Sequence, residues 1–79
     1  MSPEEILAFQ SQWPSHTPSK TQAIRRRFGF GEARFYQLLH RAARSAEGIA
    51  AHPVTARLVR EHAALRASER SLGKQGAII

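Results

Sequence analysis

The sequence predicts an all-α protein, a small bundle of about four helices that contains a helix-turn-helix. Apolar residues recur at spacings of three and four along four stretches of the chain, and proline or hydroxyl residues stand where three of these stretches begin. A Phe-Gly-Phe-Gly step at residues 28–31 separates the middle two stretches. The 79 residues, 42% of them hydrophobic, have room for one domain with a modest core.

The first expected helix begins after Ser2 and ends at Pro14. Ser2 can cap this helix, Pro3 suits its first position, and Glu4 and Glu5 in the first turn favour the helix dipole. Its inward stripe consists of Ile6, Phe9, Gln10 and Trp13.

The second expected helix follows a loop at residues 14–18 that is rich in proline and hydroxyl residues. Ser19 or Thr21 is its expected cap, and the apolar spacing continues to about Phe28. The last turn of this helix therefore carries the three consecutive arginines of the chain.

Gly29 stands where the end of a helix favours a left-handed residue. A third helix can begin at Gly31 or Glu32, after a very short connection, and its apolar period fades around Arg44. The sequence thus predicts a tight turn between two helices.

Residues 46–52 are small and loosely patterned, and we expect no regular element there. Pro53 is well placed as the first residue of a last helix that runs to about Leu72. The apolar stripe of that helix consists of Val54, Leu58, Val59, His62 and Leu65. The expected domain is therefore 1–72, followed by a flexible C-terminal tail at 73–79.

The turn after Phe28 has the spacing of a helix-turn-helix, in which the second helix enters the DNA major groove and the first crosses the backbone. The motif needs inward apolar residues at five positions around its glycine. These positions are Ile24, Phe28, Phe30, Phe35 and Leu38. Arg25 departs from the pattern, because many such motifs have a small residue four before the glycine, where the helices touch most closely.

Aromatic side chains at helical spacing in so small a domain are expected to form its core rather than base-stacking platforms. The expected core aromatics are Phe9, Trp13, Phe28, Phe30 and Phe35. Tyr36 is the exception, since it lies beside the inward Phe35 and can face solvent or a ligand.

Positive charge is concentrated in the middle of the chain. Twelve Lys and Arg residues against six Glu residues give a net charge of +6, and residues 20–44 hold seven of the basic residues and one Glu. Residues 1–19 hold two Glu residues and no Lys or Arg. This distribution favours a polyanionic partner, and we expect double-stranded DNA.

The outward face of the third helix is the expected reading surface. Arginine can donate two hydrogen bonds to guanine, glutamine can pair with adenine, and a tyrosine can reach a phosphate or a thymine methyl group. The expected base-reading residues are Arg34 and Gln37, with Tyr36 and Ala33 beside them. The expected phosphate-binding residues are Lys20, Arg26, Arg27, His40, Arg41 and Arg44.

At these residues the chain resembles a family of small, mostly uncharacterised actinobacterial and actinophage proteins. The pattern of that family combines an aromatic-bearing first helix, an "IRxRFG" step, an "RYYQxL" step and a later basic helix after a proline. Here these segments read "ILAFQSQW" (6–13), "IRRRFG" (24–29), "RFYQLL" (34–39) and "HPVTARLVR" (52–60), so the resemblance spans about 4–72. Phe35 replaces the first tyrosine of the pattern. The resemblance implies a layout similar to helix-turn-helix modules and brings no established ligand.

Several classes of function are disfavoured by what the chain lacks. It has no cysteine and no aspartate, and the four histidines, at 16, 40, 52 and 62, do not have the spacing of metal ligands. No Gly-flanked strained serine, carboxylate pair or phosphate-cradling loop is present. We therefore expect a protein that is not an enzyme and has no metal or cofactor.

No stretch approaches the roughly 20 apolar residues of a membrane span. The N-terminus lacks the basic start of a secretion signal. We expect a soluble cytoplasmic protein that is nucleoid-associated if it binds DNA and has no membrane partner.

The leading hypothesis is a small transcriptional regulator that docks its third helix in the major groove. The alternative is a protein-interaction adaptor that binds the transcription machinery or another acidic protein, and an architectural DNA-binding role uses the same basic face. The last helix either completes the core with Val54, Leu58 and Leu65 or provides the surface of a homodimer. A symmetric dimer would place two recognition helices about 34 Å apart on DNA.

Overall fold

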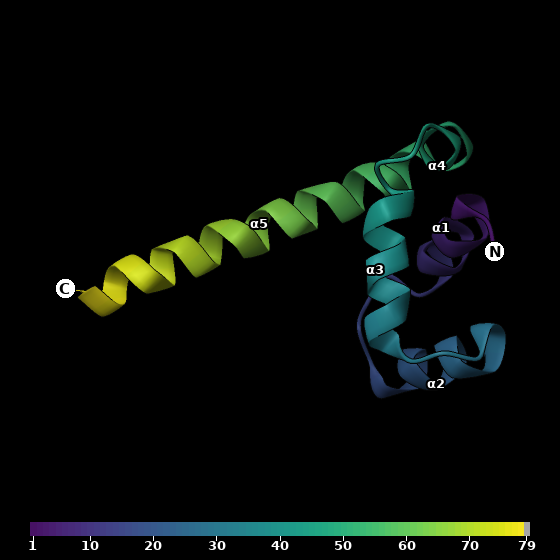
Figure 1. Ribbon diagram of the computed structural model, residues 1–79, viewed down its shortest axis with the longest axis horizontal. Helices are drawn as coiled ribbons and strands as arrows, with labels where there is room; N and C mark the ends of the chain where they lie inside the picture. Colours follow the sequence, from purple (N-terminus) through teal and green to yellow (C-terminus); the bar gives the residue numbers. More distant parts are fainter. Residues whose placement is uncertain (79) are drawn as a thin grey trace.

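The computed structural model describes the backbone of residues 1–78 and the side chains of residues 1–66. In this part of the chain it contains five α-helices and no strand. The helices are α1 Pro3–Gln12, α2 Pro18–Phe28, α3 Glu32–Ala42, α4 Ala46–Ala51 and α5 Pro53–Ile78. The first four helices and the start of α5 form a globule, and the rest of α5 projects from it (Figure 1). The predicted all-α helical bundle is confirmed, with one helix more than expected.

Side-chain caps begin the first two helices. The Glu5 backbone N–H donates to Ser2 Oγ at 3.2 Å, and the Ser2 N–H donates to the Glu5 carboxylate at 3.4 Å, so α1 begins with a capping box as its first residues suggest. α2 begins at least two positions earlier than predicted. Thr17 rather than Ser19 or Thr21 is its cap, because Pro18 fits the first helical position and leaves the Thr17 hydroxyl free to accept from the Lys20 N–H.

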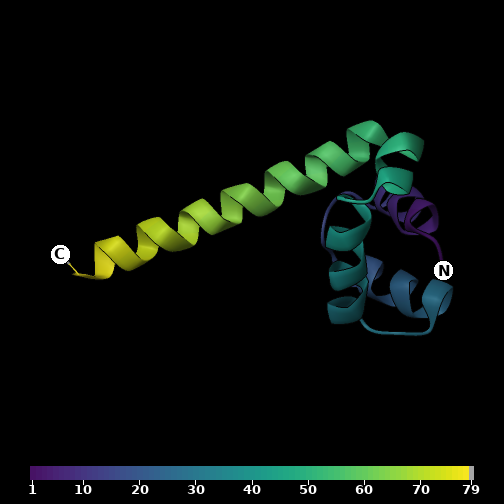
Figure 2. The same ribbon diagram turned by 45° about the horizontal axis from the view of Figure 1, so that its top comes forward.

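The turn after α2 has the predicted conformation. Gly29 is left-handed, with φ of 82° and ψ of 6°, and its N–H donates to the Arg25 carbonyl at 2.9 Å. Three residues, 29–31, connect α2 to α3, and the two helices cross steeply (Figures 1 and 2). The turn places the last turn of α2 beside the start of α3.

The core forms where α1, α2 and α3 meet. Ile24 and Phe35 are fully buried, while Phe28, Phe30 and Leu38 are partly buried against the core, so all five inward positions of the predicted turn face it. The Phe9 ring packs edge-on against Phe28 and Phe35, at 5.3 Å between ring centroids in each case. Trp13 also packs against this cluster. The aromatic residues expected in the core are confirmed there.

α4 occupies the segment for which no element was expected. Ser45 caps it by accepting from the Gly48 N–H at 2.9 Å. Gly48 itself is buried, and a Cβ atom at this position would lie 2.2 Å from the Ala42 carbonyl oxygen and 2.8 Å from Leu7 Cδ1. Small residues allow this close packing, and they also explain why the sequence shows no apolar period there.

α5 contacts the globule through Val59 of the predicted stripe and through Ala56, which the prediction did not include. Ala56 and Val59 are buried, whereas Val54, Leu58 and Leu65 are 70%, 58% and 60% exposed. The expectation that these three residues complete the core is therefore wrong. Alanine faces the globule because it lets α5 approach closely, and the larger side chains are left outside.

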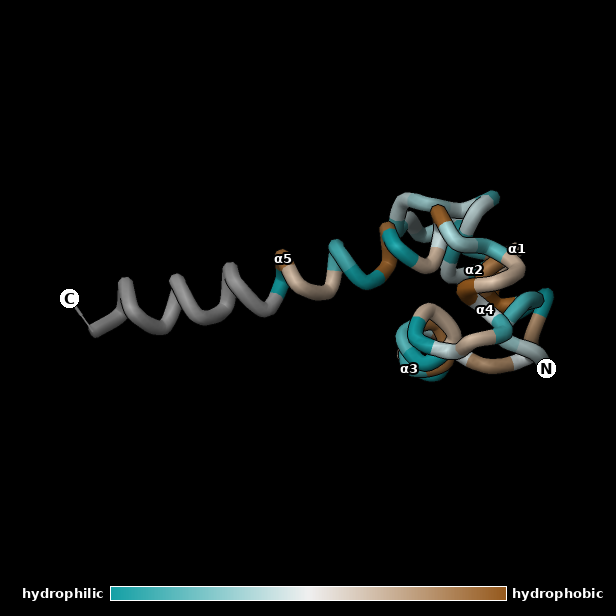
Figure 3. Tube along the Cα trace, turned by 90° about the horizontal axis from the view of Figure 1, so that it is seen from above, coloured by the Kyte–Doolittle hydropathy of each residue, from teal (hydrophilic) through white to brown (hydrophobic). Residues whose placement is uncertain are grey.

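A hydrogen bond from α5 to α3 fixes the start of α5. Arg60 donates to the carbonyl of Ala43, just past the end of α3, at 2.6 Å. The helix then continues through Gly73 and Gly76 to Ile78, beyond the expected end at about Leu72. Figure 3 shows hydrophilic and hydrophobic positions along α5 where it leaves the globule. The side chains of the expected tail, and Ile79 entirely, lie outside the described residues.

None of the helices within residues 1–78 is both long enough and apolar enough to cross a membrane.

The packing around Gly48 predicts that Gly48→Ala destabilises the protein. The added methyl group would have to displace the backbone carbonyl of Ala42, so we expect a loss of about 1–3 kcal/mol in the free energy of unfolding, measured by urea denaturation. Gly31→Ser is the control, because the nearest atom to its new Cβ is a flexible Arg25 side-chain nitrogen at 3.9 Å. Equal stability of Gly48→Ala and wild type would contradict this account of α4.

Candidate nucleic-acid interface

One face of α3 is exposed and polar. Phe35, Leu39 and Ala42 turn one side of the helix into the core. The 3.6-residue period then directs another set of side chains to the opposite side. This set, here called the α3 outer face, consists of Ala33, Arg34, Gln37, Arg41 and Arg44, all of them exposed.

The last turn of α2 adds three exposed arginines, but they point in different directions. Arg25 lies beside the glycine turn, with a guanidinium nitrogen 3.9 Å from the position of a Cβ atom on Gly31. Arg27 lies toward α1, because it lines a hollow with Glu4 and Glu5. Its guanidinium is also 5.7 Å from the ring of the adjacent Phe28.

Arg25 thus lies close to the start of α3, although from the sequence it stood out only as a departure from the motif. Its position four residues before Gly29 could have revealed this, since residues four apart are neighbours on a helix. Arg26 is exposed, as expected of a phosphate contact.

Lys20 is buried, which corrects its assignment as a phosphate contact. The residue is 1% exposed, and its Nζ donates to Gln10 Oε1 at 2.5 Å. The ammonium also lies 5.5 Å and 5.0 Å from the ring centroids of Phe35 and Tyr36. The spacing of Lys20, Ile24 and Phe28 by four residues places them on one helical stripe, and this is the feature that could have predicted the burial.

Burial lowers the pKa of Lys20 from 10.5 to about 8, because the charged form loses its hydration. The acceptor on Nζ is a neutral amide, and none of the Glu residues within 1–66 forms an ion pair with it. Within residues 1–66 the ammonium is therefore stabilised by one amide and two aromatic rings.

Tyr36 lies on the flank of α3 and not on its outer face. The residue is partly buried, and its hydroxyl makes a 2.9 Å hydrogen bond with His16 Nδ1. His16 Nε2 in turn lies 3.2 Å from the Glu32 carboxylate, to which the Thr21 hydroxyl donates at 2.9 Å. Burial, and then the Glu32 charge, raise the pKa of Tyr36. This network holds the loop before α2 against α3, a role for His16 that the sequence did not indicate.

His40 is also partly buried, and it lines a cavity beneath α5. Burial lowers its pKa, and the charges of Arg44 and Arg66 lower it further. At neutral pH this histidine is consequently a weaker phosphate contact than the exposed arginines around it.

The side chains described do not gather three or more His or Glu residues into a group that could hold a metal ion.

These observations define a small all-α protein in which a glycine turn presents a helix with a basic, glutamine-bearing outer face. The chain belongs to DUF3263, a family of proteins of unknown function, and the match covers residues 2–71. No curated protein and no solved structure matches the chain. The expected resemblance is confirmed as membership of an uncharacterised family, which gives no residue a role.

The burial of Lys20 predicts that stability rises with pH. In the unfolded chain Lys20 has a pKa near 10.5 and in the folded protein about 8, so between these values the unfolded state binds a proton that the folded state does not. The free energy of unfolding should therefore increase, on the order of 1 kcal/mol, from about pH 8 to about pH 10. Urea denaturation across this window measures the change.

Lys20→Met is the control and should remove most of the rise. Above about pH 10 the raised pKa of Tyr36 acts in the opposite direction, because the unfolded chain then loses the phenolic proton first. The same rise in Lys20→Met as in wild type would exclude Lys20 as its source.

Proposed function

We propose that this protein binds double-stranded DNA as a small transcriptional regulator, with α3 in the major groove and the end of α2 on the backbone. The observation that carries this proposal is the α3 outer face itself. It has arginine and glutamine side chains free of the core, directly after a steep glycine turn from another basic helix. Helix-turn-helix proteins read DNA with the early residues of such a second helix.

Arg34 and Gln37 are the proposed base contacts. They lie one turn apart in the first half of α3 and are exposed. Their side chains suit guanine and adenine edges respectively, and Ala33 beside them can contact a thymine methyl group. Tyr36 is left out of the proposed set, since its hydroxyl is bonded to His16.

The proposed phosphate contacts surround these base contacts. Arg25 and Arg26 stand at the end of α2, while Arg41 and Arg44 stand at the far end of the α3 outer face. If all four neutralise phosphates, the logarithm of the binding constant should fall with the logarithm of salt concentration with a slope of about −3 to −4. Lys20 is excluded by its burial, and Arg27 is weakened as a candidate by its position toward α1.

The second candidate is a protein-interaction adaptor that uses α5. The exposed stripe of Val54, Leu58 and Leu65 favours it, because a row of large apolar side chains on a projecting helix is typical of a protein contact. The partner would be a second copy of the chain, the transcription machinery or another acidic protein. A homodimer through α5 is also compatible with DNA binding, since it would pair two α3 helices.

The first test measures binding to random-sequence duplex by fluorescence anisotropy over a range of salt concentrations. Arg41→Ala should weaken binding and reduce the magnitude of the salt slope by about 1. Arg57→Ala is the matched control, because it removes the same charge from α5, where the Arg57 side chain is 73% exposed and pairs with Glu61. Equal effects of the two substitutions would show that the α3 outer face is not the binding surface.

The second test asks whether bases are read. Selection from a random duplex pool at near-physiological salt should enrich a motif with the wild-type chain and lose it with Arg34→Ala. Binding without enrichment would favour an architectural role. No binding even at low salt would reject the DNA proposal and leave the adaptor.

A further inference from the structure

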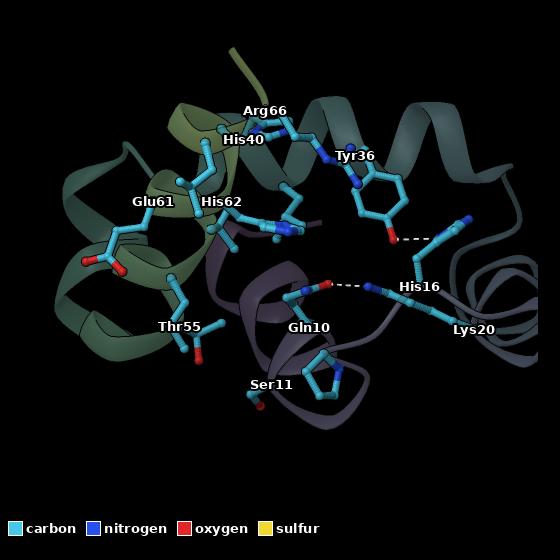
Figure 4. A pocket seen from close by; sticks show the side chains of 16 residues that line it. Gln10, Ser11, His16, Lys20, Tyr36, His40, Thr55, Glu61, His62 and Arg66 are labelled. Carbon is cyan, nitrogen blue, oxygen red and sulfur yellow. Dashed lines mark hydrogen bonds between the residues drawn. The ribbon is translucent and has the colours of Figure 1, made fainter. Parts of the chain in front are cut away.

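A cavity of about 470 Å³ lies between the globule and the first half of α5 (Figure 4). Gln10 of α1, Lys20 of α2 and Tyr36 of α3 face it from one side, and His62 and Arg66 of α5 from the other. Its volume is within the range of about 300–1,000 Å³ that is typical of small-molecule sites. The proposed DNA contacts Arg34 and Gln37 do not line it.

The floor of this cavity holds an incompletely neutralised charge. Buried ammonium groups are normally paired with a carboxylate, because an isolated buried charge is costly. The Lys20 ammonium has a neutral amide, Gln10, as its hydrogen-bond acceptor, and within residues 1–66 no Glu pairs with it. An ammonium has three N–H donors, so it can bond an anionic oxygen while keeping Gln10.

Among residues 1–66, Arg66 adds a second permanent positive charge to the lining of the cavity, and His40 and His62 also line it. Glu61 also lines it, but its carboxylate is bound to Arg57 at 3.0 Å, on the same helix. The local charge therefore favours an anion over a neutral or cationic ligand.

The remaining wall is apolar. Leu39 and Val59 are buried at its base, and Leu58 and Leu65 form its rim, where they are 58% and 60% exposed. An apolar group placed here would remove the exposed leucine surface from water, which is favourable. The lining of the cavity thus combines cationic groups with an apolar surface.

We propose that this cavity binds a small amphipathic carboxylate. The carboxylate pairs with the ammonium of Lys20, and the apolar body lies against Leu39, Leu58 and Val59. This site is separate from the α3 outer face, and the inference does not depend on DNA binding.

The experiment compares two carboxylates, 4-phenylbutyrate and octanoate, with their neutral amides by titration of the full chain. Tyr36 is the one tyrosine and Trp13 the one tryptophan of the chain, so their ring NMR resonances report separately on the cavity and on the core outside it. We expect a carboxylate to shift the Tyr36 resonances and leave those of Trp13, and to bind about tenfold or more tightly than its amide. If neither carboxylate binds more tightly than its amide, the proposal is wrong.

Three variants locate the site. Lys20→Met keeps an apolar side chain and removes the ammonium, and it should cost about tenfold or more in carboxylate affinity. Leu58→Glu places an acid on the exposed rim, where folding does not depend on it, and should weaken binding similarly. Val54→Glu is its control, because Val54 is exposed on the same helix and does not line the cavity.

Equal carboxylate affinity of Leu58→Glu and Val54→Glu would overturn the proposal. The proposal would also be wrong if the wild-type chain is a dimer that Leu58→Glu dissociates and no carboxylate shifts the Tyr36 resonances. The cavity would then hold a second copy of the chain. Neither readout contains DNA, so failure here and failure of the DNA proposal are distinguishable.

Discussion

Phe35 is the residue on which the arrangement of the helices depends. Its fully buried ring lies 5.3 Å from Phe9 of α1, 5.8 Å from Phe28 of α2 and 5.3 Å from Tyr36, measured between centroids. Three helices thus pack around one side chain, and the Lys20 ammonium lies over the same ring. Because Phe35 fixes the position of α3, it also determines the directions in which the other faces of α3 point.

α3 consequently has three faces with different roles. Phe35 and Leu39 point into the core, Arg34 and Gln37 point to solvent, and Tyr36 points toward the cavity beneath α5. The left-handed Gly29 supports this division, since it turns the chain sharply and brings the end of α2 beside the start of α3. A single helix therefore contributes to the core, to the proposed DNA interface and to the proposed carboxylate site, and Leu39 belongs to both the core and the carboxylate site.

The C-terminal part of the globule is held by close approach rather than by large apolar side chains. Gly48 leaves no space for a Cβ atom, and Ala56 and Ala43 are fully buried where α3, α4 and α5 meet. Dispersion contacts at this close approach add to the burial of Leu7, whose side chain packs against Gly48. As a result Leu58 and Leu65 are left on the rim of a cavity, where they are available to a ligand or a partner.

The sequence alone determined the features that depend on neighbouring residues. These are the cap at Ser2, the helix start at Pro53, the left-handed Gly29 and the aromatic core, because capping, glycine conformation and helical period act over a few residues. It also predicted Arg34, Gln37 and Arg41 as exposed. Only the tertiary structure decided that Lys20 and Tyr36 turn inward, that residues 46–51 form a helix and that α5 packs through Ala56 instead of Leu58. These outcomes depend on the shape and charge of helices that are distant in the sequence. Glycine and alanine residues that permit close packing also produce no apolar pattern in the sequence.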